Sequence, residues 1–381
     1  AAGAVDDAHI VGLTSSKLSG NLPALNASSL TNIPAANITG TLPAISGANL
    51  TGLVATLAGL TDTTVAAADP VINTNPSSGV GHFWVNTVTG DCFVCKVATS
   101  NNNEWQNVGA GAGDIVPGPY SASFLVIAGG GAGGRAGDRS SGGGGAGGYR
   151  SSFNSENSGG GVSAQTALTL AVGTQYTVTI GAGAAGHTNG NVEESGAASS
   201  ISGSDITDVT TTGGGGGAGE GSGTAASGGS GGGAGNQGGA GSRVVGEGYD
   251  GGASTNLNTS GGRGGGGGGA SQVGQTGGGG AGLASTISGS SVTRAGGGGG
   301  DTNHGPAAGG TGTTATSGTV NTGSGGGGHG WNQSSGGGGS GVVILRVATT
   351  RYSGTTTGSP TVSTSGSDTI ITFNGSGSYT G

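Results

Sequence analysis

The chain has 381 residues, of which 99 are glycine and 9 are proline, and only 4% are aromatic. Charged residues make up 7% of the chain, against about a quarter in an ordinary soluble domain, and the formal net charge is −8. These values argue against a basic nucleic-acid-binding face and a leucine-rich core of this length. No apolar run reaches the ~18 residues of a membrane-spanning helix, so we expect no membrane insertion.

Residues 1–69 contain a short repeat built on Leu-Pro-Ala or Ile-Pro-Ala triplets, which begin at Leu22, Ile33 and Leu42. The spacing of the apolar residues fits neither a helix nor a regular alternation, and it predicts short extended segments separated by turns. One such thread cannot bury its apolar stripe alone. We therefore predict an oligomeric stalk, a homotrimer of identical chains, with a disordered linker as the alternative.

Residues 70–112 predict a small β module. The segments 82–86 and 92–97 alternate like strands around a Thr-Gly-Asp turn and predict a hairpin, whose apolar face Trp84 and Trp105 help to cover. Cys92 and Cys95 invite a redox or zinc interpretation, but a second cysteine pair is missing. Residues three apart on a strand also face opposite sides. We expect two unrelated strand cysteines, with no metal and no cofactor.

Residues 113–347 form the glycine-rich domain, which apolar strands at 123–128 and 341–347 bracket. Between them, 168–170 and 176–180 predict a hairpin and 201–209 one more strand. Residues 348–381 predict a C-terminal β-hairpin tail, with a strand at 369–373 and its partner at 376–379. No helix is predicted with any strength, so the fold class is all-β and irregular.

Glycine runs of similar length recur through the glycine-rich domain, as expected for equivalent elements of a stack. They are 129–134, 142–148, 213–219, 228–235, 264–269, 277–282, 296–300, 325–330 and 336–341. Polyglycine can form a left-handed helix of about 3 residues per turn without internal hydrogen bonds, so its backbone groups must pair with neighbouring helices. We predict a sandwich of such polyglycine-II helices, in which an occasional Ala or Ser faces out of the stack. The residues predicted to have structural roles are Leu22, Ile33, Leu42, Trp84, Trp105, Gly129, Gly142, Gly213, Gly264, Gly296 and Gly336.

The order of these motifs resembles the glycine-rich domain of bacteriophage tail fibres. The similarity rests on the strand 124–128 running into glycine, the run 142–148 followed by Tyr149, the segment 176–181, and the closing strand 340–346. The stalk repeat and the Trp84/Trp105 module also look like parts of such fibres. The resemblance implies a tail-tip adhesin, in which glycine helices form a sandwich and variable loops contact a bacterial surface receptor.

Side-chain chemistry is concentrated between the glycine runs. The histidines are scattered, no nucleophile–base pair or carboxylate pair has a catalytic spacing, and Gly-x-Gly-x-x-Gly matches are noise in such a composition, so we expect no enzyme. If the runs stack, the interruptions become loop tips at the ends of the stack, where binding residues are commonly found. The receptor-binding candidates are Tyr149, Arg150, His187, Arg243, Tyr249, Asp250, Asp301, His304, Trp331 and Asn332.

The sequence thus favours a virion tail-fibre protein that binds a glycan or an outer-membrane protein of a bacterium. Its N-terminal side would join other tail proteins, and no nucleic acid would be bound. The alternative is a self-assembling extracellular filament or sheath. An ice-binding protein is a weaker option, because it would need a strict repeat and a uniform face, whereas the interruptions here are chemically diverse.

Overall fold

The computed structural model describes residues 62–109, 113, 115, 117–137, 139–188, 193–219, 223–255, 262–300, 315–330 and 333–381. Residues 1–61 of the predicted stalk, with Leu22, Ile33 and Leu42, lie outside this part of the chain. The described residues form strands, turns and extended segments, and the helical elements among them are two single 3-10 turns, Gly159–Gly161 and Thr349–Arg351. The expected all-β and irregular class is confirmed.

The first sheet of the chain has four strands in sequence order: β1 (Thr63–Ala66), β2 (Phe83–Asn86), β3 (Cys92–Val97) and β4 (Glu104–Asn107). Strands β2 and β3 pair antiparallel, which confirms the predicted hairpin. Strand β1 comes before residue 70 and runs parallel to β2. Residues 63–66, which were predicted to belong to the stalk, are therefore part of this sheet.

A small aromatic core lies on one face of the four-stranded sheet. Phe93, Cys95 and Trp105 are fully buried in it. The ring of Trp84 meets that of Trp105 edge-on, with 5.8 Å between their centroids. The indole N–H of Trp84 donates to the Ala68 carbonyl over 2.8 Å, which ties the chain after β1 to this core.

The two cysteines of β3 are free thiols in different environments, so they should react at different rates. Cys92 is partly exposed and Cys95 is buried. Burial raises the pKa of the Cys95 thiol, and a backbone hydrogen bond from Val97 opposes this only in part. Because the thiolate is the reactive form, we expect an aromatic disulfide reagent to modify Cys92 in the native protein and Cys95 only after unfolding. Equal rates would contradict this packing.

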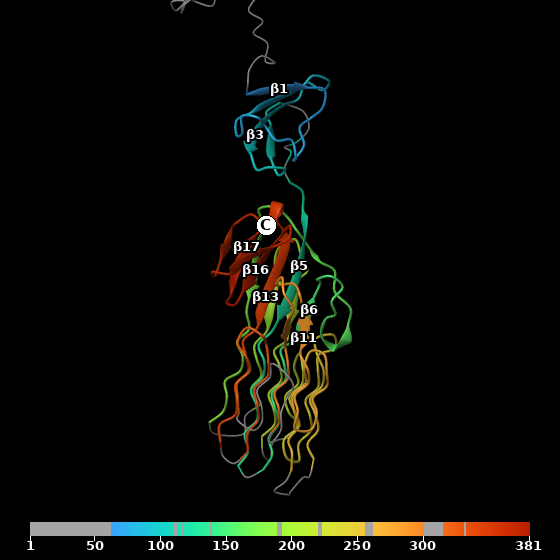
Figure 1. The fold of residues 1–381 in the computed structure, drawn as a ribbon, viewed down its shortest axis with the longest axis vertical. Coiled ribbons are helices and arrows are strands. Elements are labelled where there is room, and N and C mark those ends of the chain that lie inside the picture. The colour runs from blue at the N-terminus through green and yellow to red at the C-terminus, as the bar shows by residue number, and fades with distance from the viewer. Residues whose placement is uncertain are drawn as a thin grey trace, which may run out of the picture. The chain divides into compact units, whose positions relative to one another are not determined.

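Two antiparallel sheets pack face to face and form the β framework of the glycine-rich region (Figure 1). One has the order β15-β16-β13-β5-β6, with β7 also beside β5. These strands span Thr361–Ser365, Asp368–Phe373, Val342–Ala348, Tyr120–Ile127, Tyr149–Ser151 and Leu168–Leu170, respectively. The other has the order β10-β9-β8-β17-β14, with the spans Val209–Thr211, Ser199–Ser202, Gln175–Thr179, Gly377–Thr380 and Thr356–Thr357. A separate hairpin joins β11 (Leu283–Ser285) to β12 (Val292–Arg294).

The central strands β5 and β13 are buried on both faces, which explains their continuous apolar sequences. On one face, Phe124 and Leu345 pack against the five-stranded sheet. On the other, Leu125 and Ile344 join a second cluster that also contains Ala146 from a glycine run. The same two strands therefore connect the sandwich core to the glycine-rich stack.

Two predicted hairpins are wrong because their strands pair across the framework instead. Strand β7 pairs with β5 in the six-stranded sheet, whereas β8 pairs with β9 and β17 in the five-stranded sheet. In the C-terminal tail, β16 joins β13 while β17 joins β8. The segment 201–209, which was predicted to be one strand, instead contains the end of β9 and the beginning of β10, and these two strands pair with each other. Each of these segments has apolar partners far away in the sequence, which local patterns do not reveal.

Glycine runs continue directly from the strands into the stack (Figure 1). Their hydrogen bonds keep the strands' register. Ile127 of β5 pairs with Val342 of β13. Three residues away from this pair on each segment, the Gly130 N–H donates to the Gly339 carbonyl over 2.9 Å. A further three residues away from the strands, the Gly133 N–H donates to the Gly336 carbonyl. Runs that continue β6, β9, β10, β11 and β12 keep their strands' registers in the same way. The sheets thus set the alignment of the stack.

Backbone hydrogen bonds of the run 142–148 repeat every three residues. The N–H groups of Gly142, Gly145 and Gly148 all donate to one neighbouring run, 212–218, over 2.7–2.8 Å. In the described part of the chain, 142–148 is bonded to six segments, each of which is also bonded to the next one around it: 128–134, 212–218, 229–234, 264–270, 295–300 and 323–328. A regular strand has two neighbours, so this arrangement is a stack rather than a sheet.

Close approach of these backbones demands glycine in the interior. A Cβ atom on Gly144 would lie 2.1 Å from the Gly131 carbonyl oxygen. The expectation that Ala and Ser face out of the stack is wrong, because Ala146, Ala218 and Ser230 are buried at 0% exposure. Ala146 shows the reason, since its methyl group packs into the apolar cluster beneath β5 and β13.

Candidate functional site

The β framework occupies one end of the stack and separates the candidate residues into two groups. Runs meet strands at 127/128, 148/149 and 341/342, so residues 135–141 turn at the opposite end, called here the distal end. The candidates at the framework end are Tyr149, Arg150, Arg243, Tyr249 and Asp250. His187 is at the distal end, and Asp301, His304, Trp331 and Asn332 lie outside the described residues.

Tyr149 and Arg150 belong to β6 rather than to a loop tip, contrary to expectation. Tyr149 is fully buried in the cluster beneath the central strands. The Arg150 guanidinium lies 3.4 Å from the Glu247 carboxylate, which is buried and accepts a hydrogen bond from the Thr212 N–H over 2.7 Å. Because β6 pairs with the last three residues of β5, Leu125 to Ile127, these residues serve the framework.

Three of the predicted residues do come together. Arg243 forms an ion pair with Asp250, with 3.8 Å between the guanidinium and the carboxylate. Its guanidinium carbon lies 5.3 Å from the centre of the Tyr249 ring, within the range of a cation–π interaction. The backbone N–H of Arg243 also donates to the Asp250 carboxylate over 2.8 Å. These contacts hold the three side chains in one arrangement.

Exposed valines lie next to this group, and together they form what we call the lateral patch: Arg243, Val244, Val245, Tyr249, Asp250 and Val162. Val245 is 80% exposed, and Val162 and Val244 are 43% and 37% exposed. Val162 belongs here because its side chain is 3.7 Å from the position of a Cβ on Gly246. Arg and Tyr beside accessible apolar side chains are typical of protein-binding surfaces. Sequence reasoning missed the valines because a pair of valines in a loop carries no local signal.

The lateral patch stands on the stack itself. The Tyr249 carbonyl accepts a hydrogen bond from the Gly231 N–H over 3.0 Å, and Gly252 donates to Gly266. Residues 243–250 were expected to be a loop tip, but their C-terminal part is a member of the stack. A similar correction applies to Glu194, whose carbonyl accepts a hydrogen bond from the Ala132 N–H. A backbone of any composition can join the stack where its side chains point outward.

At the distal end, His187 is buried and held by its backbone. Its N–H donates to the Ser335 hydroxyl over 3.0 Å, and its imidazole Nε2 is buried without a hydrogen-bond partner. Arg135 and His329, which were not predicted as site residues, form a parallel bridge nearby in the stack. Arg135 follows the run 129–134 directly and His329 interrupts the run 325–330, and these positions could have identified them.

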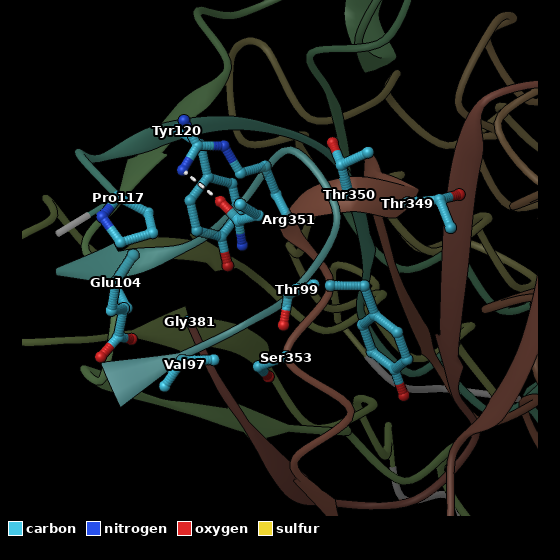
Figure 2. Close-up of a pocket in the computed structure, with 13 residues that line it drawn as sticks. Val97, Thr99, Glu104, Pro117, Tyr120, Thr349, Thr350, Arg351, Ser353 and Gly381 are labelled. Carbon is cyan, nitrogen blue, oxygen red and sulfur yellow. Dashed lines mark hydrogen bonds between the residues drawn. The ribbon is translucent and has the colours of Figure 1, made fainter. Parts of the chain in front are cut away.

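A pocket of about 290 Å³ lies near the C-terminus of the framework, and none of the six candidates that the structure describes lines it (Figure 2). Arg351 occupies one side of it and donates to the Asn102 side chain over 3.2 Å. The Arg351 guanidinium carbon is 6.0 Å from the centre of the Tyr120 ring. Arg351 is thus committed to structural contacts.

Buried tyrosines make the framework sensitive to alkaline pH. Burial, and then a 2.6 Å hydrogen bond to Asp205, raise the pKa of Tyr176 to about 12. Burial likewise raises the pKa of Tyr120, whose hydroxyl is 2.7 Å from that of Tyr379, and the pKa of Tyr149.

Because these tyrosines ionise more easily in the unfolded chain, with a pKa of about 10, their contribution to stability is complete below pH 10. It is then lost as the pH rises through the folded-state values. We expect the midpoint of urea unfolding to fall from about pH 10 upward. Replacing Tyr176 with Phe should reduce that slope, and an unchanged slope would contradict the assignment.

Within the described ranges, no group of three or more His, Cys, Asp or Glu side chains could hold a metal ion. The same ranges contain no helix with the length and apolar character needed to cross a bilayer. A family model described as a glycine-rich domain matches residues 106–348, more than half of the chain. No curated protein and no solved structure matches the chain.

Proposed function

The chain belongs to the glycine-rich domain family, and from that premise we propose that it is a bacteriophage tail-fibre protein whose glycine-rich domain binds a receptor on the bacterial surface. The receptor is a glycan or an outer-membrane protein. The observation that carries this proposal is the lateral patch, in which Arg243, Tyr249 and Asp250 are fixed among exposed valines on a backbone-bonded scaffold. Binding residues on a rigid support lose little freedom on association.

The runs of the stack are polyglycine-II helices in this proposal. Support comes from the three-residue repeat of the hydrogen bonds of 142–148, which equals the period of that helix. None of the glycines in this run has a positive φ in the left-handed region. A stack of this kind needs no large apolar core, in agreement with a chain that has 5 Phe and no Met.

The chain acts as a homotrimer in the virion tail fibre, with its N-terminal side joined to other tail proteins. The apolar repeat of residues 1–69 supports trimer formation, because one thread cannot bury it. Light scattering and negative-stain imaging of the full chain should show discrete trimers with free ends. Filaments that lengthen with protein concentration would instead support an extracellular structural polymer.

Receptor binding is tested by adding the fluorescently labelled full chain to a panel of bacterial strains and measuring bound label. We expect saturable binding to some strains. Replacing Val245 with Asp places a charge in the lateral patch and should reduce that binding about tenfold or more, the scale of an interface hot spot. Val320→Asp is the matched control, since Val320 is 68% exposed and is not part of the patch. Equal binding by the two variants would remove the patch from the proposal.

A further inference from the structure

The β15 strand leaves one long edge of the framework open. The other edges of the two sheets are short, because β6, β7 and β10 have three residues each and β14 has two. Strand β15 has five residues, Thr361–Ser365. The first four are exposed, so the side chains on both faces of this strand lie outside the two hydrophobic cores. Short edges resist pairing with other chains, and a longer one is a template for it.

Sequence features that usually protect an edge are missing from β15. Its residues are Thr-Val-Ser-Thr-Ser, without a charge or a proline inside the strand, and Val362 is 42% exposed. The neighbouring Asp368 is engaged by Arg346 at 2.9 Å, so its charge is compensated. The pairing of β15 with β16 is regular over all five positions, with no bulge. The edge is flat, uncharged and composed largely of residues that favour strands.

We propose that β15 pairs antiparallel with β15 of a second copy of this chain, which extends the six-stranded sheet across a two-fold axis. Its near-symmetric sequence fits this partner. With Ser363 on the axis, Thr361 lies opposite Ser365 and Val362 lies opposite Thr364, so hydroxyl and β-branched side chains meet and no like charges do. The same surface patch serves both copies, as a two-fold contact requires.

This contact is separate from the lateral patch and from the stalk. Pairing of five residues buries less than the ~800 Å² per partner of a standard stable interface. The association therefore depends on protein concentration, and it becomes strong only where other contacts hold two copies together.

Disulfide trapping of the full chain tests this pairing. Ser363→Cys is introduced together with Cys92→Ser, and the buried Cys95 stays unchanged. Across the axis the two new cysteines would be within disulfide range, whereas in the control Ser367→Cys, an exposed turn position, they would be far apart. We expect covalent dimers to form about tenfold faster for Ser363→Cys than for the control.

A second variant decides whether the strand edge causes the trapping. Val362→Lys adds a charge of the kind that protects natural edges, and it should lower the Ser363→Cys rate to that of the control, while Val362→Thr should preserve it. Equal rates for the two cysteine positions, or trapping that survives Val362→Lys, would overturn the proposal. If β15 instead binds another protein, no homodimer forms, which also overturns it. The binding of the Val362→Lys variant to bacterial cells is measured as well, and it tests the proposed receptor-binding function separately from the β15 pairing.

Discussion

Replacing Gly144 with alanine is expected to destabilise the glycine-rich domain severely. The new methyl group would lie 2.1 Å from the Gly131 carbonyl oxygen and 2.6 Å from its carbon, and both are backbone atoms inside the stack. Neither can move without shifting a run that has its own bonds to several neighbours. Overpacking of this kind costs about 1–3 kcal/mol or more, a large part of a typical domain stability of about 5–15 kcal/mol.

Urea denaturation followed by circular dichroism measures this effect, with Gly223→Ala as the matched control. Gly223 lies in the same glycine-rich region, is exposed, and has no atom within 4 Å of its Cβ position. Alanine there also reduces the freedom of the unfolded chain, so we expect the control to be neutral or stabilised by up to about 1 kcal/mol. Similar losses in both variants would show that close packing of the runs does not determine stability.

Replacing Leu345 with alanine is expected to have an effect of similar size by a different route. Leu345 is fully buried in the sandwich core, opposite Phe124 in the β5–β13 pair. Removing a leucine side chain from such a position costs about 2–5 kcal/mol, through lost burial and the cavity that remains. Because β13 continues directly into the run 335–341, the damage should extend to the stack.

Val362→Ala is the control for that experiment, since it removes a similar side chain from an exposed site. It should change the free energy of unfolding by no more than about 0.5 kcal/mol. The m-value of Leu345→Ala should stay equal to that of the wild type if the framework and the stack unfold together. A second transition in that variant would mean that the stack holds its register without the sheet.

Local sequence patterns predict the elements of this fold better than their partners. The apolar strands at β5 and β13 and the β2–β3 hairpin are visible in the sequence because burial on both faces and a tight turn each leave a local signature. The pairing of β7 with β5 and of β17 with β8 has no such signature, since it depends on which apolar face is nearest in space. The buried Ala146 shows the same limit within the stack.

The candidate site shows a similar division. Arg243, Tyr249 and Asp250 are close in sequence, so their grouping could be anticipated. Tyr149 resembled a loop aromatic because it follows a glycine run, yet the run ends at the framework, and the residue after it is therefore core. A glycine run has two ends with different environments, and composition does not distinguish them.

The glycine runs are ordered by backbone hydrogen bonds that continue the registers of the framework strands. Native-state hydrogen exchange, read by mass spectrometry on peptides that cover 128–134 and 142–148, tests this ordering most directly. We predict that these amides exchange as slowly as those of β5 and β13, because they open only when the domain unfolds. Exchange of the run amides at the rate of an unfolded chain, with the strands still protected, would contradict this ordering.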